Sequence, residues 1–159
     1  MSGSSGVAAG RSAARPLPSQ VSRLRRAGVS AVVLLLIEYV VGIGVNLYVT
    51  VPRADQRHGL GTALARGPAA ISVHIVVGLL LLVAAVGLLV QAVLARLPAV
   101  AAASAIGLLA IGGAVFAGTD FVSSGRPAAS MTMAVLTGVA VLSYVVGIYL
   151  LGGLPNPSP

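Results

Sequence analysis

The chain contains no cysteine, no tryptophan and no lysine among its 159 residues. Without cysteine it has no disulfides, thiolate metal sites, iron–sulfur ligation or thiol redox chemistry of its own. Without tryptophan, and with only four Tyr and two Phe, it has little material for the aromatic belts of membrane interfaces. The motifs HExxH and GxSxG and a phosphate-binding glycine loop are also missing, so we expect a non-enzymatic protein.

Charged residues are scarce as well. They make up 8% of the chain, against 57% hydrophobic residues, and the mean hydropathy is +1.02. Soluble domains carry about 25% charged residues, so this composition predicts an integral membrane protein in contact with the lipid bilayer. The net charge of +7 is concentrated near the N-terminus. Anionic lipid headgroups explain it, and we expect no nucleic-acid partner.

Four long apolar runs follow one another along the chain. Each has the roughly 20 residues that a membrane-spanning helix needs, and each is too long and too continuously apolar for a barrel strand. The sequence therefore predicts an all-α membrane protein, a four-transmembrane-helix up-down-up-down bundle. The helices are expected at about 27–51, 68–95, 98–118 and 128–151, within a domain spanning 27–154.

The first 26 residues are rich in Ser, Gly, Ala and Arg and predict a disordered basic cytoplasmic tail; residues 155–159 form a second, short tail. The run after the first tail is too long for a signal peptide, which favours a retained signal anchor. Arginines are more numerous on the side of the N-terminus and of the turn near Arg96. This bias predicts that both termini lie in the cytoplasm.

Small residues recur every four positions in the third run. One row comprises Ala102, Ile106, Ala110, Ala114 and Gly118, and a second comprises Ala99, Ala103 and Gly107. Helices in lipid associate through such small residues, which let their backbones approach closely. The rows predict that the third helix is the most closely packed.

Glu38 is the only charged residue of the first run and lies near its centre. A carboxyl group at that depth is costly unless it is paired, protonated or hydrated. Three interpretations follow: a neutral acid that fixes helix packing, a group that handles a proton, ion or substrate, and a contact with a partner subunit.

Further polar residues are candidates for binding or proton handling beside Glu38. Asn46 shares a helix face with Glu38, and His74 is expected at the depth of Asn46. Tyr144 is expected at the depth of Glu38, where its hydroxyl can hydrogen-bond the carboxyl group. Asp120 is interpreted as a solvated helix-end residue that pairs with Arg126, or else as a site residue. With Thr119, Ser123, Ser124, Ser130, Thr132 and Thr137, these residues suggest a polar funnel that narrows to Glu38.

No cofactor is predicted. Bis-histidine haem ligation needs a second intramembrane histidine, whereas the other histidine, His58, falls in a loop. Met131 and Met133 offer sulfur ligands in principle, but methionine in a helix usually serves packing. Two histidines and three acids also make no convincing metal site.

The segments 38–52 and 118–150, with the step from His74 to Gly78, resemble an uncharacterised family of four-helix integral membrane proteins from high-GC Gram-positive bacteria. The resemblance spans most of residues 30–151 and implies a protein of the bacterial plasma membrane. It implies a four-helix bundle in which Glu38, Asn46 and His74 belong to a family pattern, and it implies no activity.

The leading functional hypothesis is a small non-enzymatic membrane protein, either an accessory subunit of a membrane protein partner or a self-associating bundle. The alternative is a small transport or proton-transfer protein with Glu38 as its protonatable group. A haem- or quinone-linked redox subunit is the third.

Overall fold

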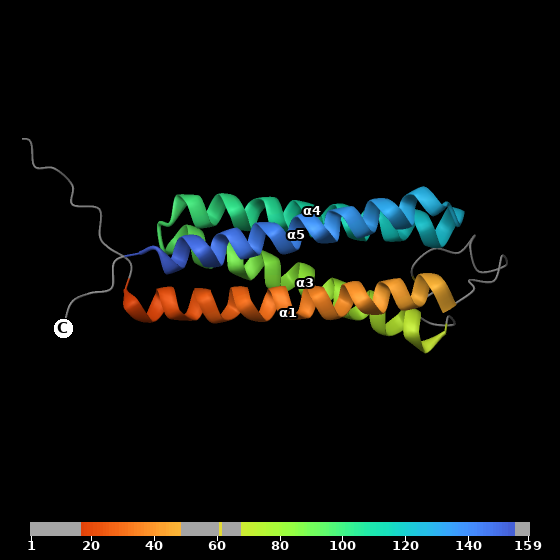
Figure 1. Cartoon of the computed structure of the whole chain (residues 1–159), viewed down its shortest axis with the longest axis horizontal. Helices are drawn as coiled ribbons and strands as arrows, with labels where there is room; N and C mark the ends of the chain where they lie inside the picture. The colour runs from red at the N-terminus through yellow and green to blue at the C-terminus, as the bar shows by residue number, and fades with distance from the viewer. Residues whose placement is uncertain (1–16, 49–60, 62–67, 155–159) are drawn as a thin grey trace, which may run out of the picture.

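A computed structural model describes residues 17–48, 61 and 68–154, and within these residues the chain forms four long α-helices (Figure 1). They are α1 (Pro18–Tyr48), α3 (Ala69–Leu94), α4 (Pro98–Ser124) and α5 (Pro127–Gly152). All four are long and apolar enough to cross a membrane. The predicted all-α four-helix membrane bundle is confirmed, and the protein is a small multi-pass membrane protein that contacts the lipid bilayer.

The helices pack as a ring in which each contacts two neighbours. Contacts join α1 to α3, α3 to α4, α4 to α5 and α5 to α1, and within the described residues no Cα atoms approach within 8 Å across the diagonals. The start of α1, the end of α5 and the α3–α4 turn lie at one end of the bundle (Figure 1). We call this the N-terminal end. The end of α1, the start of α3 and the α4–α5 turn lie at the opposite end.

Two tight turns set the antiparallel order of α3, α4 and α5. At the first, Arg96 has a φ of 54°, and the amide of Leu97 donates to the carbonyl of Ala92 at 3.1 Å. This is the hydrogen bond of a Schellman motif, with arginine at the position that glycine usually takes. At the second, Gly125 has a φ of 65° and its amide donates to the carbonyl of Phe121 at 2.8 Å.

Two predicted boundaries are wrong. Helix α1 begins at Pro18, so residues 18–26 are helical rather than part of a disordered tail. Because Arg23, Arg25 and Arg26 are exposed on α1, their charges can stay hydrated while the helix extends beyond its apolar run. The predicted loop 119–127 shrinks to residues 125–126, since α4 continues to Ser124. The ends 1–16 and 155–159 lie outside the described residues.

Helices α4 and α5 share the most extensive interface. A methyl group added at Gly107 would lie 2.7 Å from Cζ of Tyr144, so the phenol ring packs directly on the glycine backbone. Nearer the opposite end, one added at Gly113 would lie 2.9 Å from Leu136. In the second small-residue row, Ala103 and Gly107 are buried, as predicted, whereas Ala99 is exposed.

The first small-residue row only partly serves packing. Ala102 and Ile106 are exposed, and Ala110 is the buried member of that row. A row repeating every four residues drifts around a helix with 3.6 residues per turn. Its two ends therefore face different surroundings.

Candidate functional site

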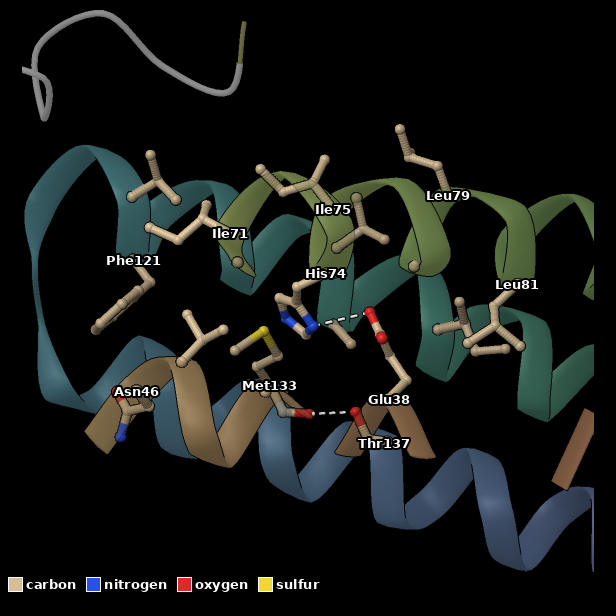
Figure 2. A pocket seen from close by; sticks show the side chains of 18 of the residues that line it. Glu38, Asn46, Ile71, His74, Ile75, Leu79, Leu81, Phe121, Met133 and Thr137 are labelled. Carbon is tan, nitrogen blue, oxygen red and sulfur yellow. Dashed lines mark hydrogen bonds and ion pairs between the residues drawn. The ribbon is translucent and has the colours of Figure 1, made fainter. Parts of the chain in front are cut away.

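Glu38, which is buried, and His74, which is half-buried, form an acid–imidazole pair between α1 and α3. Nδ1 of His74 lies 2.8 Å from Oε1 of Glu38, and their side chains are 22% and 9% exposed respectively (Figure 2). The contact lies away from the direction of an ideal hydrogen bond, and neither atom has another partner among the described residues. At this separation a proton carried by either residue can lie between the two atoms.

Two glycines make room for the pair. A methyl group at Gly42 would lie 3.0 Å from Cε1 of His74, and one at Gly78 would lie 3.6 Å from Oε1 of Glu38. Glu38 is therefore level with Gly78, and Gly42 with His74, in one antiparallel register. Larger residues at both glycines would push the two helices apart or displace the imidazole.

The pair lies in the wall of a cavity of about 130 Å³ that is lined by residues of all four helices. Its lining is mainly apolar, and Ile75, Leu81 and Met133 lie around the pair (Figure 2). Besides the pair, the lining includes Leu35, Ile71, Ile75, Leu81, Ile111, Ala114, Val122, Phe121 and Met133. A carboxyl group thus meets a space that offers it few polar partners.

A second hollow, a groove of about 510 Å³, adjoins this cavity between α1 and α5. Cavity and groove share both members of the pair and also Asn46, Phe121, Met133 and Thr137. The groove alone reaches Tyr39, Leu47 and Met131, which are 38%, 66% and 71% exposed. The pair is therefore open toward the surface that α1 and α5 present to lipid.

The bundle is closed on the N-terminal side of the pair. The register that places Glu38 level with Gly78 brings Leu35 level with Leu81 and Ala31 level with Ala85. All four of these residues are at most 6% exposed. Glu38 and His74 thus lie in the cavity wall near its closed end, with Glu38 within about one turn of Leu35 and Leu81, and we call this end the floor of the cavity.

The predicted polar funnel is wrong in its chemistry. Thr137 lines the cavity, but its Oγ1 donates to the backbone carbonyl of Met133 at 2.9 Å (Figure 2). Thr119 makes the same kind of bond to Val115, at 3.0 Å. Ser and Thr hydroxyls often satisfy themselves in this way within a helix. The space is an apolar cavity with a polar floor.

Tyr144 is buried, but it does not hydrogen-bond Glu38 as predicted. Its hydroxyl has no hydrogen-bond partner among the described residues, and its ring lies against Gly107 on α4. The error is one of depth. Gly28 packs against Ile148, and this antiparallel register puts Gly138 and Thr137, not Tyr144, level with Glu38.

Asn46 and His74 do not share a depth either. The α1–α3 register places His74 level with Gly42, one helical turn from Asn46. Asn46 is exposed and its side chain points away from the pair (Figure 2). Asn46 therefore belongs to the rim of the cavity.

Asp120 lies outside the cavity and pairs with Arg126, as one of the two interpretations predicts. Both carboxylate oxygens lie 2.8 Å from Nη2 of Arg126, and Ser124 accepts a further bond from Nε at 3.2 Å. The side chains of Arg126 and Asp120 are 67% and 39% exposed. This geometry closes the α4–α5 turn and offers no sheltered site.

Among the residues that the structure describes, no three His, Asp or Glu side chains come together as a metal site requires. The one pair of such groups in the cavity is Glu38 and His74. His58 lies outside the described residues, so the absence of a haem stays a prediction. Comparisons with protein-family models, curated proteins and solved structures find no match.

Nothing in the sequence pointed to Phe121 as a cavity residue, and Met133 was a candidate only as a sulfur ligand. Both line the cavity and the groove. Gly118 is the one hint in the sequence, because it marks a close approach: a methyl group there would lie 3.4 Å from the sulfur of Met133. Small residues on α4 thus mark where larger side chains of α5 cross the bundle.

Proposed function

We propose that this protein is a non-enzymatic membrane protein that binds a small apolar molecule within the bilayer. The observation that carries the proposal is the position of Glu38 and His74 at the floor of an apolar cavity. Burying an ion pair seldom adds stability over apolar residues of the same volume. An intramembrane acid is accordingly a functional-site hypothesis by default.

The size and lining of the cavity support binding. An apolar cavity of about 150 Å³ stays dry and takes up benzene, and the cavity here is close to that volume, at about 130 Å³. Ligand sites are typically apolar with a few polar groups that fix orientation. Glu38 and His74 would be those groups.

The test fills the cavity without touching the pair. Ala114 lines the cavity, and Ala114→Leu should weaken binding of 4-fluorotoluene at least tenfold, as measured by ¹⁹F NMR in nanodiscs. Ala102 is exposed on the same helix, so Ala102→Leu is the matched control and should leave binding unchanged. If wild type takes up no 4-fluorotoluene, or if both variants bind it equally well, the proposal is wrong.

Proton transfer is the second candidate, because Glu38 and His74 lie 2.8 Å apart, close enough for a proton to pass between them. The close packing on the N-terminal side of the pair favours binding over conduction. If proton transfer is the function, Glu38→Gln should abolish proton flux into vesicles while the protein still folds. Unchanged flux in Glu38→Gln would exclude this role for Glu38.

We further propose that both termini lie in the cytoplasm of a bacterial cell. The support is the basic N-terminal end of the bundle, where Arg23, Arg25, Arg26 and Arg96 are exposed. Because the chain has no cysteine, a single introduced cysteine shows on which side of the membrane its position lies. An impermeant maleimide added to intact cells should label Ser123→Cys and spare Ser22→Cys. The reverse pattern would invert the topology. The accessory-subunit or self-associating role stays a prediction.

A further inference from the structure

We infer that the molecule bound here has a ring-sized headgroup with a hydroxyl and an apolar tail, and that it enters from the bilayer between α1 and α5. The inference rests on the proposed binding function and names the class of ligand. It follows from the atoms that the Glu38–His74 pair leaves unused, from the volume of the cavity and from the position of the groove.

The first step concerns hydrogen-bonding capacity. If Glu38 is ionised and His74 is protonated, Nδ1 donates to Oε1 and Nε2 also carries a hydrogen. If Glu38 is protonated on Oε1 and His74 is neutral, the carboxyl group donates to Nδ1, and the ring hydrogen again lies on Nε2. In both of these states, each of which has zero net charge, Nε2 is a donor and Oε2 is an acceptor.

These two atoms are available to a ligand. Oε1 of Glu38 and Nδ1 of His74 are buried. Oε2 of Glu38 and Nε2 of His74 are not among the buried unpaired atoms, and neither Oε2 nor Nε2 forms a hydrogen bond within the described residues. Both side chains line the cavity. A hydroxyl is the smallest group that both accepts and donates a hydrogen bond, so it complements Nε2–H and Oε2 together.

The second step concerns size and charge. The cavity of about 130 Å³ holds a group close to the size of benzene. Its floor lies deep in the membrane-spanning part of the bundle, where a charged headgroup such as a phosphate would cost several kcal/mol to bury. An uncharged phenol, quinol or cyclic alcohol meets both conditions, and a phospholipid headgroup meets neither.

The third step concerns the tail. The groove adjoins the cavity at the pair and is bounded by Tyr39, Ile43 and Leu47 of α1 and by Met131 and Ala134 of α5. Of these, Ile43, Leu47 and Met131 are 43%, 66% and 71% exposed, so the rim of the groove faces lipid. An apolar tail lying in the groove would remain in a lipid-like medium along its whole length.

The experiment compares 4-hexylphenol, 4-hexylanisole and hexylbenzene as competitors of 4-fluorotoluene in nanodiscs. The three share a ring and a tail, but the phenol donates and accepts, the ether only accepts, and the hydrocarbon does neither. Leaving Oε2 without its donor should cost about tenfold in affinity, so 4-hexylphenol should compete about ten times better than 4-hexylanisole. Competition by 4-hexylcyclohexanol, compared with that by 4-hexylphenol, shows whether the site prefers a saturated or an aromatic ring.

Removing both partners deletes the polar floor without leaving either atom unpaired. In Glu38→Met with His74→Phe, the preference for phenol over ether should fall to about one while hexylbenzene still binds. The same two changes at exposed positions of the same helices, Val40→Met with Val73→Phe, are the control and should keep the preference. A phenol preference that survives in the double variant at the pair would overturn the inference.

The groove is tested by chain length. Ala134 lines the groove only, and Ala134→Phe should weaken 4-hexylphenol at least fivefold while leaving phenol itself unchanged. Val135→Phe, at a residue that is 56% exposed, should affect neither compound. If wild type binds all three ring compounds equally, the ligand class is wrong while the binding function stands. If it binds none of them, the proposed function fails as well.

Discussion

The N-terminal half of the bundle and the opposite half share one α1–α3 register but are packed in opposite ways. In the N-terminal half, Ala31 and Leu35 of α1 face Ala85 and Leu81 of α3, and each is at most 6% exposed. In the opposite half, Gly42 and Gly78 replace such side chains, and the space they leave holds the imidazole and the carboxyl group. The same helix pair thus makes a closed core and an open site.

The difference teaches where stability and function reside in a small membrane protein. Close packing of small and branched residues is what holds helices together in lipid, and the N-terminal half supplies it. The opposite half gives up part of that packing for a cavity with a paired acid at its floor. Substitutions in the two halves should therefore act in opposite directions.

The largest effect is expected from breaking the pair on one side. Glu38→Met leaves the buried Nδ1 of His74 without its partner, which should cost about 2–3 kcal/mol in the free energy of unfolding. Adding His74→Phe should return most of that loss, because both polar groups are then gone. Unfolding in mixed SDS micelles measures both variants. A double variant no more stable than the single one would contradict the pairing.

One substitution made in both halves tests the contrast directly. Ala85 is 2% exposed in the closed half, so Ala85→Leu should overpack it and cost about 2 kcal/mol. Ala114→Leu fills the cavity and should be neutral or stabilise by up to about 1 kcal/mol. The same unfolding assay compares the two, and equal losses would refute the difference in packing.

The α4–α5 interface should show a smaller contrast between glycines. At Gly107 a methyl group would meet the Tyr144 ring at 2.7 Å, so Gly107→Ala should cost about 1–2 kcal/mol. At Gly112 nothing lies within 4 Å, and Gly112→Ala should gain about 0.5 kcal/mol from helix propensity. Thermal unfolding in detergent ranks the two, and a neutral Gly107→Ala would mean that the ring does not rest on the glycine.

The smallest effect is expected at the exposed pair of the α4–α5 turn. Asp120→Asn removes the charge that Arg126 contacts, but both side chains are well exposed. Such surface pairs contribute about 0–1 kcal/mol, so the loss should be under about 1 kcal/mol and should shrink in high salt. A loss above about 2 kcal/mol would show that this turn does more than close the helix pair.

The four helices follow from the sequence because length and hydropathy alone decide what spans a bilayer. The start of α1 does not, because three arginines before an apolar run fit a hydrated tail and a hydrated helix equally well. A single chain also does not reveal how far one helix slides along the next. Depths counted from the centres of the runs were wrong by about one turn for Asn46 and by nearly two turns for Tyr144.

Parts of the site were nevertheless predictable from individual residues. Glu38 and His74 stand out because polar groups are rare in these helices, and Gly42 and Gly78 suggest space beside them. Their contact depends on the α1–α3 register, which side-chain packing over the full helix length sets. The apolar wall was not predictable, since Phe121 and Met133 look like any other apolar residue until the helices are placed.

The most direct test of the pair as a polar anchor is ¹⁵N NMR of the histidine rings in bilayers. The chain has two histidines, so His58→Ala leaves the imidazole of His74 alone. We predict a hydrogen on Nε2, an Nδ1 signal that moves in Glu38→Gln, and an Nε2 signal that moves when 4-hexylphenol is added. Ring signals unaffected by Glu38→Gln and by 4-hexylphenol would contradict the account.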